Sequence, residues 1–455
     1  MSDAEDEAEV KLLIGFDDTD SPRTGCTTYI AALLIEKLQK LGVHFFDYPN
    51  LIRLNPNAPW KTRGNGAICL RTICEEQLLE DVKECVVETV EEHADLSYVG
   101  TDPGVVFWAG DVPVELEDFS RRAVQGIVEM SEALRLIKAC KAEAVGLKKG
   151  RGIIGGLAAV GERLKGDHTY EFIAYRTPEN RGTRRRVDAS SVVRMDRQMG
   201  RSSFSNVDPE THRILITPRG PDPILYGIRG ETPEAVRRAY ELVLSSEPIE
   251  RWVIYRTNQG TDAHLKRAVS IGEVKPHNPV AIAGEVSADP QVIKGGHVIF
   301  QIEDRTGKID CAAYEPTGRL RDTARLLIAG DSVEVCGGVR QPSSGNPITV
   351  NLEKISIIKM APSLVSRNPL CPVCGKRTKS VGKGQGFECR RCGFHGSNLR
   401  KIVQEVERPI KPGLYVTSPR SQRHLTKPLS RYGLEKPESS RDLEKPIPYS
   451  LFSSL

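Results

Sequence analysis

Residues 12–21 read LLIGFDDTDS, a short apolar run of strand type that ends in three carboxylates within four residues. Carboxylates this close repel one another, and burial strengthens the repulsion, so a fold that keeps them together usually needs a cation. Mg²⁺ prefers oxygen ligands and usually binds together with substrate phosphates. Acids at the carboxyl end of a strand also lie where open α/β sheets bind ligands. We therefore predict a magnesium and phosphate site at Asp17, Asp18 and Asp20, with a solvated acidic turn as the alternative.

The residues after this turn predict a helix whose N-terminus faces the acids. Residues 27–41 place apolar side chains at helical spacing, namely Ile30, Leu33, Leu34, Leu38 and Leu41. Thr27 or Thr28 suits the N-cap, and Gly42 suits the end of the helix. The positive end of a helix beside carboxylates is a favourable place for metal-bound phosphates.

A basic loop with two glycines follows two short strands, which we expect at 43–46 and 51–54. Residues 61–66 read KTRGNG and precede an apolar strand at 67–73. Glycine lets backbone amides approach a ligand closely, and basic side chains neutralise phosphate oxygens. An Asn-Gly hairpin turn is the alternative, and the Walker A pattern is absent from the loop. The candidate nucleotide-binding residues are Lys61, Thr62, Arg63, Gly64, Asn65 and Gly66.

Helices and strands alternate through the first 270 residues, which predicts α/β or α+β units. We expect helices at 75–92, at 119–144 with a break at Ser131, and at 232–244, and strands at 105–108, 170–175, 213–217 and 252–255. The glycine-rich residues 150–156 precede another apolar run, which is a weak signal because many turns have this composition.

Five short strands and one helix are expected from residue 275 onward. The strands fall at 280–286, 297–303, 308–314, 332–339 and 348–358, and the helix falls at 320–327. This order matches the OB fold, a partly open barrel that binds nucleic acid. Another small barrel without a ligand is the alternative.

Two CxxC pairs separated by fourteen residues form the most specific motif of the chain. They are Cys371 with Cys374 and Cys389 with Cys392. Each pair directs two thiolates to one side of a tight turn, and two pairs complete a tetrahedral, structural zinc site. Basic residues around the cysteines suggest binding of RNA or DNA. A short basic helix is expected next, at 398–406.

Length and charge distribution indicate a multidomain protein with a polyanionic partner. The chain has 455 residues, enough for three or four domains, and a formal net charge of +4. Basic clusters occur at 148–151, at 181–186 and from Arg367 onward. No apolar run is long enough to span a membrane and the acidic start is not a secretory signal, so we expect a cytoplasmic protein with its other seven cysteines reduced. The chain from Glu435 onward is expected to be disordered.

Taken together, these motifs resemble the archaeal tRNA(Ile) agmatinylcytidine synthetase family. They occur in the order DDTDS at 17–21, CTTY at 26–29, RLNP at 53–56, KTRGNG at 61–66, GRG at 150–152 and YGIRGE at 226–231, followed by the barrel and the zinc ribbon. The resemblance covers residues 11–430 and implies a multidomain α/β (α+β) fold. The implied units are an acidic N-terminal extension at 1–10, a kinase-like ATP-binding domain at 11–127, a ferredoxin-like domain at 128–270, an OB-fold β-barrel at 275–360, a zinc ribbon at 366–400 and a basic, partly disordered tail at 401–455.

The resemblance also implies an activity. The family joins agmatine to C2 of the wobble cytidine of tRNA(Ile) with a CAU anticodon, which then decodes AUA. It consumes ATP, releases AMP and pyrophosphate, and activates the cytosine oxygen by phosphorylation. The implied cofactors are ATP, Mg²⁺ and Zn²⁺, with catalytic roles for Asp17, Asp18 and Asp20 and autophosphorylation of Thr27. The implied partners are tRNA(Ile) and agmatine, and no protein partner is indicated.

Some roles stay open from the residues alone. Agmatine is a dication, so its pocket needs carboxylates or carbonyls, and we expect Asp208 and Glu231 there. Without the resemblance, Thr27 is equally well explained as a helix cap. Two other functions also remain open: a non-enzymatic RNA-binding protein built on the barrel and ribbon, and an RNA-modifying ligase that uses another amine.

Overall fold

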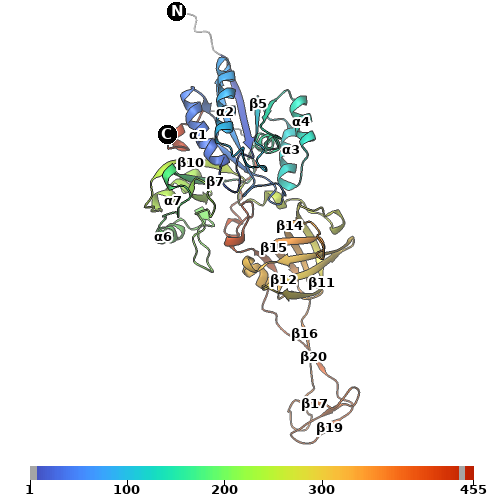
Figure 1. The fold of residues 1–455 in the computed structure, drawn as a ribbon. Coiled ribbons are helices and arrows are strands. Elements are labelled where there is room, and N and C mark those ends of the chain that lie inside the picture. The colour runs from blue at the N-terminus through green and yellow to red at the C-terminus, as the bar shows by residue number, and fades with distance from the viewer. Residues whose placement is uncertain (1–7, 440–445, 455) are drawn as a thin grey trace, which may run out of the picture.

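The computed structural model describes residues 8–439 and 446–454. An α/β body, a β-barrel and a small ribbon on a two-stranded stalk follow one another along the molecule (Figure 1). The acidic extension predicted at 1–10 lies mostly outside the described residues. Among the residues that are described, no helix is long and apolar enough to cross a membrane.

One mixed sheet of ten strands forms the body. Its order is β6-β5-β1-β4-β3-β10-β7-β9-β8, with β2 paired to β4. The pairs are antiparallel except for β3 with β10, which run parallel and join the first half of the sheet to the second. The strands are β1 (Glu9–Asp17), β2 (His44–Phe45), β3 (Asn50–Arg53), β4 (Gly66–Glu75), β5 (Gly104–Ala109), β6 (Glu143–Gly146), β7 (Thr169–Arg176), β8 (Ser203–Phe204), β9 (Ile224–Gly230) and β10 (Ile249–Thr257).

Helices cover both faces of this sheet, because successive side chains of a strand point to opposite faces. The helices are α1 (Thr27–Lys40), α2 (Leu79–His93), α3 (Val114–Gln125), α4 (Met130–Ala139), α5 (Gly152–Gly161), α6 (Ala189–Met199) and α7 (Pro233–Leu242). In β1, Leu12, Ile14 and Phe16 join the core that contains α1, α2, α6 and α7. Leu13 joins the opposite core, which contains α3, α4 and α5. The acidic turn begins where β1 leaves these two apolar layers.

Three predictions for the body need correction. The helix expected at 119–144 is two helices, α3 and α4, which are separated at residues 126–129 rather than at Ser131 and are followed by β6. Residues 213–217, all of them described, form no strand, and Ile214 contributes only an isolated bridge. β6 pairs with β5, and α5 packs on β1, so the first unit extends beyond residue 127.

The glycine-rich residues 150–156 lead into α5 and let it pack directly on the sheet. A Cβ on Gly156 would lie 2.9 Å from the carbonyl oxygen of Gly15 in β1. A Cβ on Gly155 would lie 2.6 Å from Cγ of Asp17. No side chain larger than hydrogen fits at either contact, so these glycines set the distance between α5 and the acidic turn.

The predicted OB fold is confirmed. Its strands follow the order β13-β12-β11-β14-β15, and β13 also pairs with β15, which closes the barrel. The elements are β11 (Pro279–Ile293), β12 (His297–Asp304), β13 (Gly307–Ala313), α8 (Arg319–Ala324), β14 (Ser332–Arg340) and β15 (Thr349–Lys359). β21 (Gly413–Val416) adds one further strand beside β15.

A two-stranded stalk carries the ribbon away from the barrel (Figure 1). β16 (Leu364–Arg367) pairs antiparallel with β20 (Ile402–Glu405). The helix predicted at 398–406 is therefore wrong, because the second strand of the stalk needs an extended chain there. The ribbon contains β17 (Lys379–Ser380), β18 (Phe387–Glu388) and β19 (His395–Gly396), which form one small sheet.

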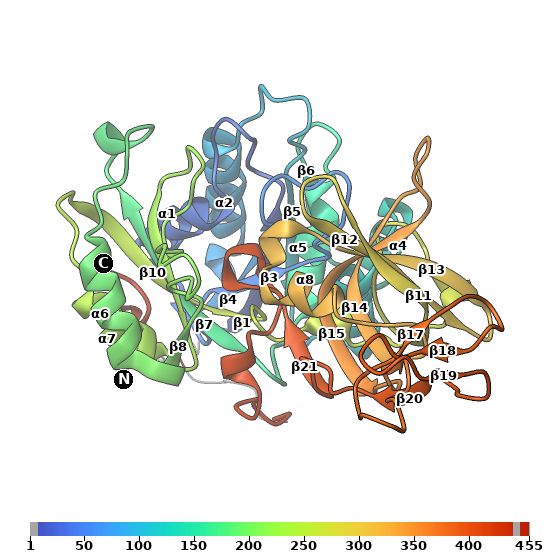
Figure 2. The same cartoon turned by 90° about the horizontal axis from the view of Figure 1, so that it is seen from below.

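The chain after β21 returns to the body, where it runs between the barrel and the ten-stranded sheet (Figure 2). We call residues 417–436 the C-terminal strap. Farther along, Phe452 is fully buried beside Phe45, and its carbonyl accepts a hydrogen bond from Ile254 N–H at 2.8 Å. The disorder predicted from Glu435 onward is thus wrong for the described residues, while 440–445 and 455 lie outside them.

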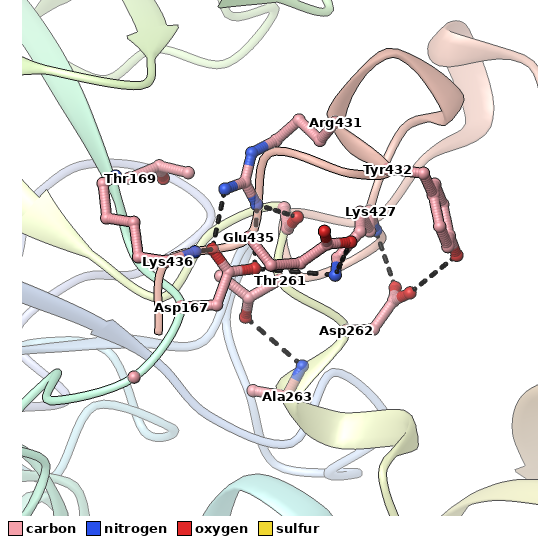
Figure 3. A network of polar contacts seen from close by, with 12 residues as sticks. Asp167, Thr169, Thr261, Asp262, Ala263, Lys427, Arg431, Tyr432, Glu435 and Lys436 are labelled. Carbon is pink, nitrogen blue, oxygen red and sulfur yellow. Dashed lines mark hydrogen bonds and ion pairs between the residues drawn. The ribbon is translucent and has the colours of Figure 1, made fainter. Parts of the chain in front are cut away.

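Buried ion pairs fasten the C-terminal strap to the body. The fully buried Arg431 pairs with Asp167 at 2.9 Å (Figure 3). It also pairs with Glu231 at 2.6 Å. The backbone N–H of Lys427 donates to the Asp262 carboxylate at 2.6 Å. Loss of one partner would leave a buried charge unpaired, so these contacts hold the strap in one position.

Candidate active site

A cavity of about 570 Å³ lies where the two halves of the sheet meet. The loop after β1, the loop before β4 and strands β7 and β9 contribute to its walls. Its volume is in the range typical of ligand pockets. All the residues predicted at the catalytic and nucleotide-binding positions line it: Asp17, Asp18, Asp20, Thr27, Lys61, Thr62, Arg63, Gly64, Asn65 and Gly66.

Asp17 and Asp18 are half-buried carboxylates that the protein does not fully neutralise. Burial and the neighbouring Asp18 and Asp20 raise the pKa of Asp17 to about 8. Asp18 pairs with Arg151 at 2.7 Å, yet burial raises its pKa to about 6. A bound cation would restore the charge of both groups, since an opposite charge favours the ionised carboxylate.

Asp20 has both carboxylate oxygens occupied by donors of the basic loop. Its Oδ2 pairs with Nε of Arg63 at 2.7 Å, and its Oδ1 accepts a hydrogen bond from the Thr62 hydroxyl at 2.8 Å. Within the described part of the chain, the three aspartates do not converge on one point as a metal-ligand cluster does. The predicted acidic group is therefore a pair, Asp17 and Asp18, with Asp20 bound to the basic loop.

The basic loop connects β3 to β4 and is too long for the two-residue Asn-Gly hairpin considered above, since β3 ends at Arg53 and β4 begins at Gly66. Arg63 and Asn65 adopt positive φ angles of 42° and 48°. Such angles are uncommon outside glycine and need support from neighbours. The amide of Asn65 provides it by donating to the carbonyl of Asn55 at 2.7 Å.

Thr27 is the first residue of α1, and the N-cap is Cys26, whose side chain forms no capping bond. A cap at Thr27 or Thr28 is therefore wrong. The Thr27 hydroxyl instead accepts a hydrogen bond from the Thr19 hydroxyl at 3.0 Å, at the wall of the cavity. This hydroxyl is free of the capping role and lies at the positive end of α1.

Sequence reasoning missed a buried carboxylate on the other side of the cavity. Glu171 in β7 is 4% exposed and pairs with Arg229 at 3.2 Å and with Arg53 at 3.6 Å. The amide of Gln259 donates to it as well, and His424 of the strap contacts Gln259. The available signal was a glutamate inside an otherwise apolar strand.

Asp208 and Glu231 lie outside the cavity, contrary to the expectation that they bind agmatine. Asp208 is fully buried and pairs with Arg420 at 3.0 Å. Glu231 pairs with Arg431 of the same strap. Both carboxylates neutralise partner arginines, which a ligand would first have to displace.

The break between α3 and α4 forms a further wall of the cavity. Ile127, Val128 and Met130 line it with apolar side chains. Glu129 lines it as well, is exposed, and has no ion-pair partner among the described residues. An apolar surface with a free carboxylate suits a ligand that has an alkyl chain and a cationic end.

The four ribbon cysteines meet at one point. Their Sγ atoms all lie within 4.8 Å of one another, with Cys371 3.5 Å from Cys392 and Cys374 3.4 Å from Cys389. Four thiolates around one centre fit tetrahedral zinc and leave no open position. The residues thus fit a structural metal rather than a catalytic one.

These features define a class of protein: a multidomain enzyme in which an α/β body with a candidate phosphate-binding cavity is followed by an OB barrel and a zinc ribbon. Family models match the chain in the same order. They describe a TiaS TCKD domain at 13–149, a TiaS FLD domain at 150–264, an OB-fold nucleic acid binding domain at 280–358 and a TiaS C-terminal zinc ribbon domain at 368–410.

The chain belongs to the family of tRNA(Ile) 2-agmatinylcytidine synthetases (TiaS), which confirms the resemblance seen in its motifs. The member from Pyrococcus horikoshii is 44% identical over 416 residues, which cover 91% of this chain and 96% of that protein. The member from Archaeoglobus fulgidus is 41% identical over 416 residues, with the same shares covered.

Solved structures of the family are similar over nearly the whole chain. A crystal structure of TiaS in complex with its isoleucine tRNA and ATP has a TM-score of 0.83 at 40% identity, covering 93% of this chain and 97% of that one. A complex of TiaS with the same kind of tRNA, AMPCPP and agmatine has a TM-score of 0.80 at 38% identity, with the same coverage. The predicted fold class is confirmed.

Proposed function

We propose that this chain is an ATP-dependent ligase that joins agmatine to C2 of the wobble cytidine of tRNA(Ile) with a CAU anticodon. The observation that carries the proposal is the single cavity in which the acidic turn, Thr27 and the KTRGNG loop meet. Relatives named for this reaction match through the whole cavity-forming body, the barrel and the ribbon.

The chemistry requires activation of a poor leaving group. Phosphorylation of the cytosine O2 turns it into a good one. The amine of agmatine then attacks C2 and gives up a proton, a C–N bond forms, and the C–O bond breaks as phosphate leaves with the electron pair. The protein has to hold the phosphoryl donor, the base and the amine in line and stabilise the developing charge.

Mg²⁺ fits the pair Asp17 and Asp18. It is usually held by one or two carboxylates together with substrate phosphates, and both groups have raised pKa values that a cation would reverse. When bound, it would neutralise phosphate charge. Asp20 orients Arg63, and the charges of Arg63 and Lys61 would stabilise the phosphoryl group during transfer.

Thr27 is our proposed site of autophosphorylation. Its hydroxyl lies in the cavity wall at the N-terminus of α1. Backbone N–H groups there favour a phosphate. Thr27→Ser should retain activity and Thr27→Val should lose it, whereas equal activity of both variants would exclude the role.

We place agmatine along the break between α3 and α4. Its methylene chain would lie on Ile127, Val128 and Met130, and Glu129 would bind one cationic end. Glu129→Gln should raise KM for agmatine about tenfold, the effect of losing one charged hydrogen bond, with kcat unchanged. Glu115→Gln, on the exposed first turn of α3, is the matched control. An unchanged KM would exclude Glu129.

The barrel and the ribbon would bind the tRNA while the target base unstacks and enters the cavity. The ribbon exposes Lys379, Lys383, Arg390 and Arg391, a basic surface suited to phosphates. Zinc would hold this surface in shape through the four cysteines. The need for tRNA and ATP supports a cytoplasmic location.

The test is turnover by purified protein with tRNA(Ile), agmatine and ATP. AMP should form, and mass spectrometry of the wobble nucleoside should show added agmatine. RNA binding without AMP formation would favour the non-enzymatic alternative. A different added mass would identify a ligase that uses another amine.

A further inference from the structure

His424 brings an imidazole ring from the C-terminal strap to the wall of the cavity. Its carbonyl accepts a hydrogen bond from Gly260 N–H at 2.8 Å. The next residue, Leu425, is 1% exposed in the core that contains α3, α4 and α5. The backbone of the strap therefore fixes where the ring lies.

The hydrogen-bond network assigns the ring's tautomer. The amide nitrogen of Gln259 donates to Glu171, so its Oε1 is an acceptor. His424 Nδ1 lies 2.9 Å from this Oε1 and must carry the hydrogen, because two lone pairs would repel at that distance. Nη2 of Arg229 also lies 3.2 Å from Nδ1, but this longer contact cannot be a hydrogen bond to a protonated nitrogen.

The other ring nitrogen, Nε2, is then an acceptor that faces the basic loop. It lies 2.9 Å from the point where a side chain on Gly64 would begin. No residue that the structure describes donates a hydrogen bond to it. Nη1 of Arg53 lies 2.7 Å from the same point, so a glycine here leaves room for both groups at the cavity wall.

The charges around the His424 ring determine which kind of ligand group can donate a hydrogen bond to Nε2. Burial, followed by Arg53, Arg229 and Lys61, lowers the pKa of His424 well below its ordinary value, so the ring is neutral. Glu171 faces the same group but is already paired with both arginines. The surplus of positive charge disfavours an ammonium or guanidinium ligand here and leaves a neutral N–H donor as the suitable partner.

We infer that Nε2 of His424 accepts a hydrogen bond from the exocyclic amino group of a nucleobase bound in the cavity. Leu51, Ile173 and Ile216 line the same cavity with apolar side chains suited to the faces of a base. The inference rests on the proposed function, which brings two such bases to the site: the adenine of ATP and the target cytosine. In either case His424 is a specificity-determining residue.

The experiment compares wild type with His424→Phe on substrates that lack one amino group. ATP is compared with purine riboside triphosphate, and tRNA(Ile) with cytidine at the wobble position is compared with the same tRNA carrying 2-pyrimidinone riboside. Removal of the recognised amino group should lower kcat/KM about tenfold more for wild type than for His424→Phe, which is the value of one neutral hydrogen bond. Intrinsic differences in reactivity cancel in this cycle.

The substrate pair, ATP or tRNA with its analogue, that shows this difference identifies the base that His424 contacts. His424→Gln offers an amide oxygen and should keep part of the discrimination. Equal losses in wild type and His424→Phe in both arms would overturn the inference. If wild type does not turn over its natural substrates, the proposed function has failed, and Kd values for the same analogues still decide whether His424 binds an amino group. Should His424→Phe not fold, His424→Asn replaces it, because its shorter side chain does not reach the cavity.

Discussion

Gly155→Ala should inactivate the enzyme without unfolding it. Gly155 lies on the face of α5 that packs on the acidic turn. A Cβ there would lie 2.6 Å from Cγ and 2.8 Å from Cβ of Asp17. Helix α5 cannot yield, because Gly156 and Gly152 hold its backbone against β1 and β5. Asp17 has to move instead, and because its Cβ is one of the close atoms, its backbone at the end of β1 shifts as well.

The size of the effect follows from these distances. Ordinary van der Waals contact begins near 3.4 Å, so Cγ of Asp17 must shift by about 0.8 Å, and Oδ2, the nearest atom, by more. A misplacement of about 1 Å in a reacting group can cost about 10²-fold in rate. Alanine in a helix interior is favoured over glycine by about 1 kcal/mol, which offsets part of the strain. We therefore expect kcat/KM to fall about 10²-fold while the melting temperature stays within a few degrees.

The assay measures AMP formation with tRNA(Ile), agmatine and ATP, together with thermal melting and tRNA affinity. Gly166→Ala is the matched control, because nothing lies within 4 Å of its added Cβ and its backbone is not in the left-handed region. Near-wild-type activity of Gly155→Ala would refute the reasoning. Equal loss in the control, or loss of tRNA binding, would refute it as well.

Three further predictions concern the zinc ribbon, the barrel and the C-terminal tail. Replacing Cys371 and Cys374 together by serine should release zinc and weaken tRNA binding, while ATP affinity stays unchanged; full zinc content by metal analysis would contradict the ligand assignment. Burial alone would raise the pKa of Glu353, but the histidine and arginine side chains around it lower this pKa to about 2 from an ordinary 4.5. The stabilisation from the ionised Glu353 is therefore complete above pH 4.5 and lost as the pH falls toward 2. Over this range, wild type should lose about 3 kcal/mol of unfolding free energy relative to Glu353→Gln. If denaturant unfolding shows the same pH dependence for both proteins, this role of Glu353 is excluded. Phe452→Ala should cost about 3–5 kcal/mol by chemical denaturation, because the ring is fully buried, whereas Leu451→Ala, 43% exposed, should cost little; equal effects would show that the tail does not pack as described.

Much of the secondary structure was predictable because it depends on local patterns. The run at 12–16 alternates between two cores, and the barrel strands and the CxxC pairs follow spacings that neighbouring residues set. The helix expected at 398–406 failed because its strand pairing is made with residues 364–367, which lie far away in the sequence. The disorder expected after Glu435 failed because the apolar contacts of Phe452 come from distant parts of the body.

The sequence by itself determined that the acidic turn and the KTRGNG loop are chemically suited to a phosphate site, because residue type decides charge and hydrogen-bonding capacity. Only the tertiary structure decided that the pKa values of Asp17 and Asp18 are raised while Asp20 is bound to Arg63. It also decided that Asp208 and Glu231 neutralise strap arginines, which leaves them outside the cavity. A carboxylate's role depends on which cation lies within about 3 Å of it, and the fold brings such partners together from positions hundreds of residues apart.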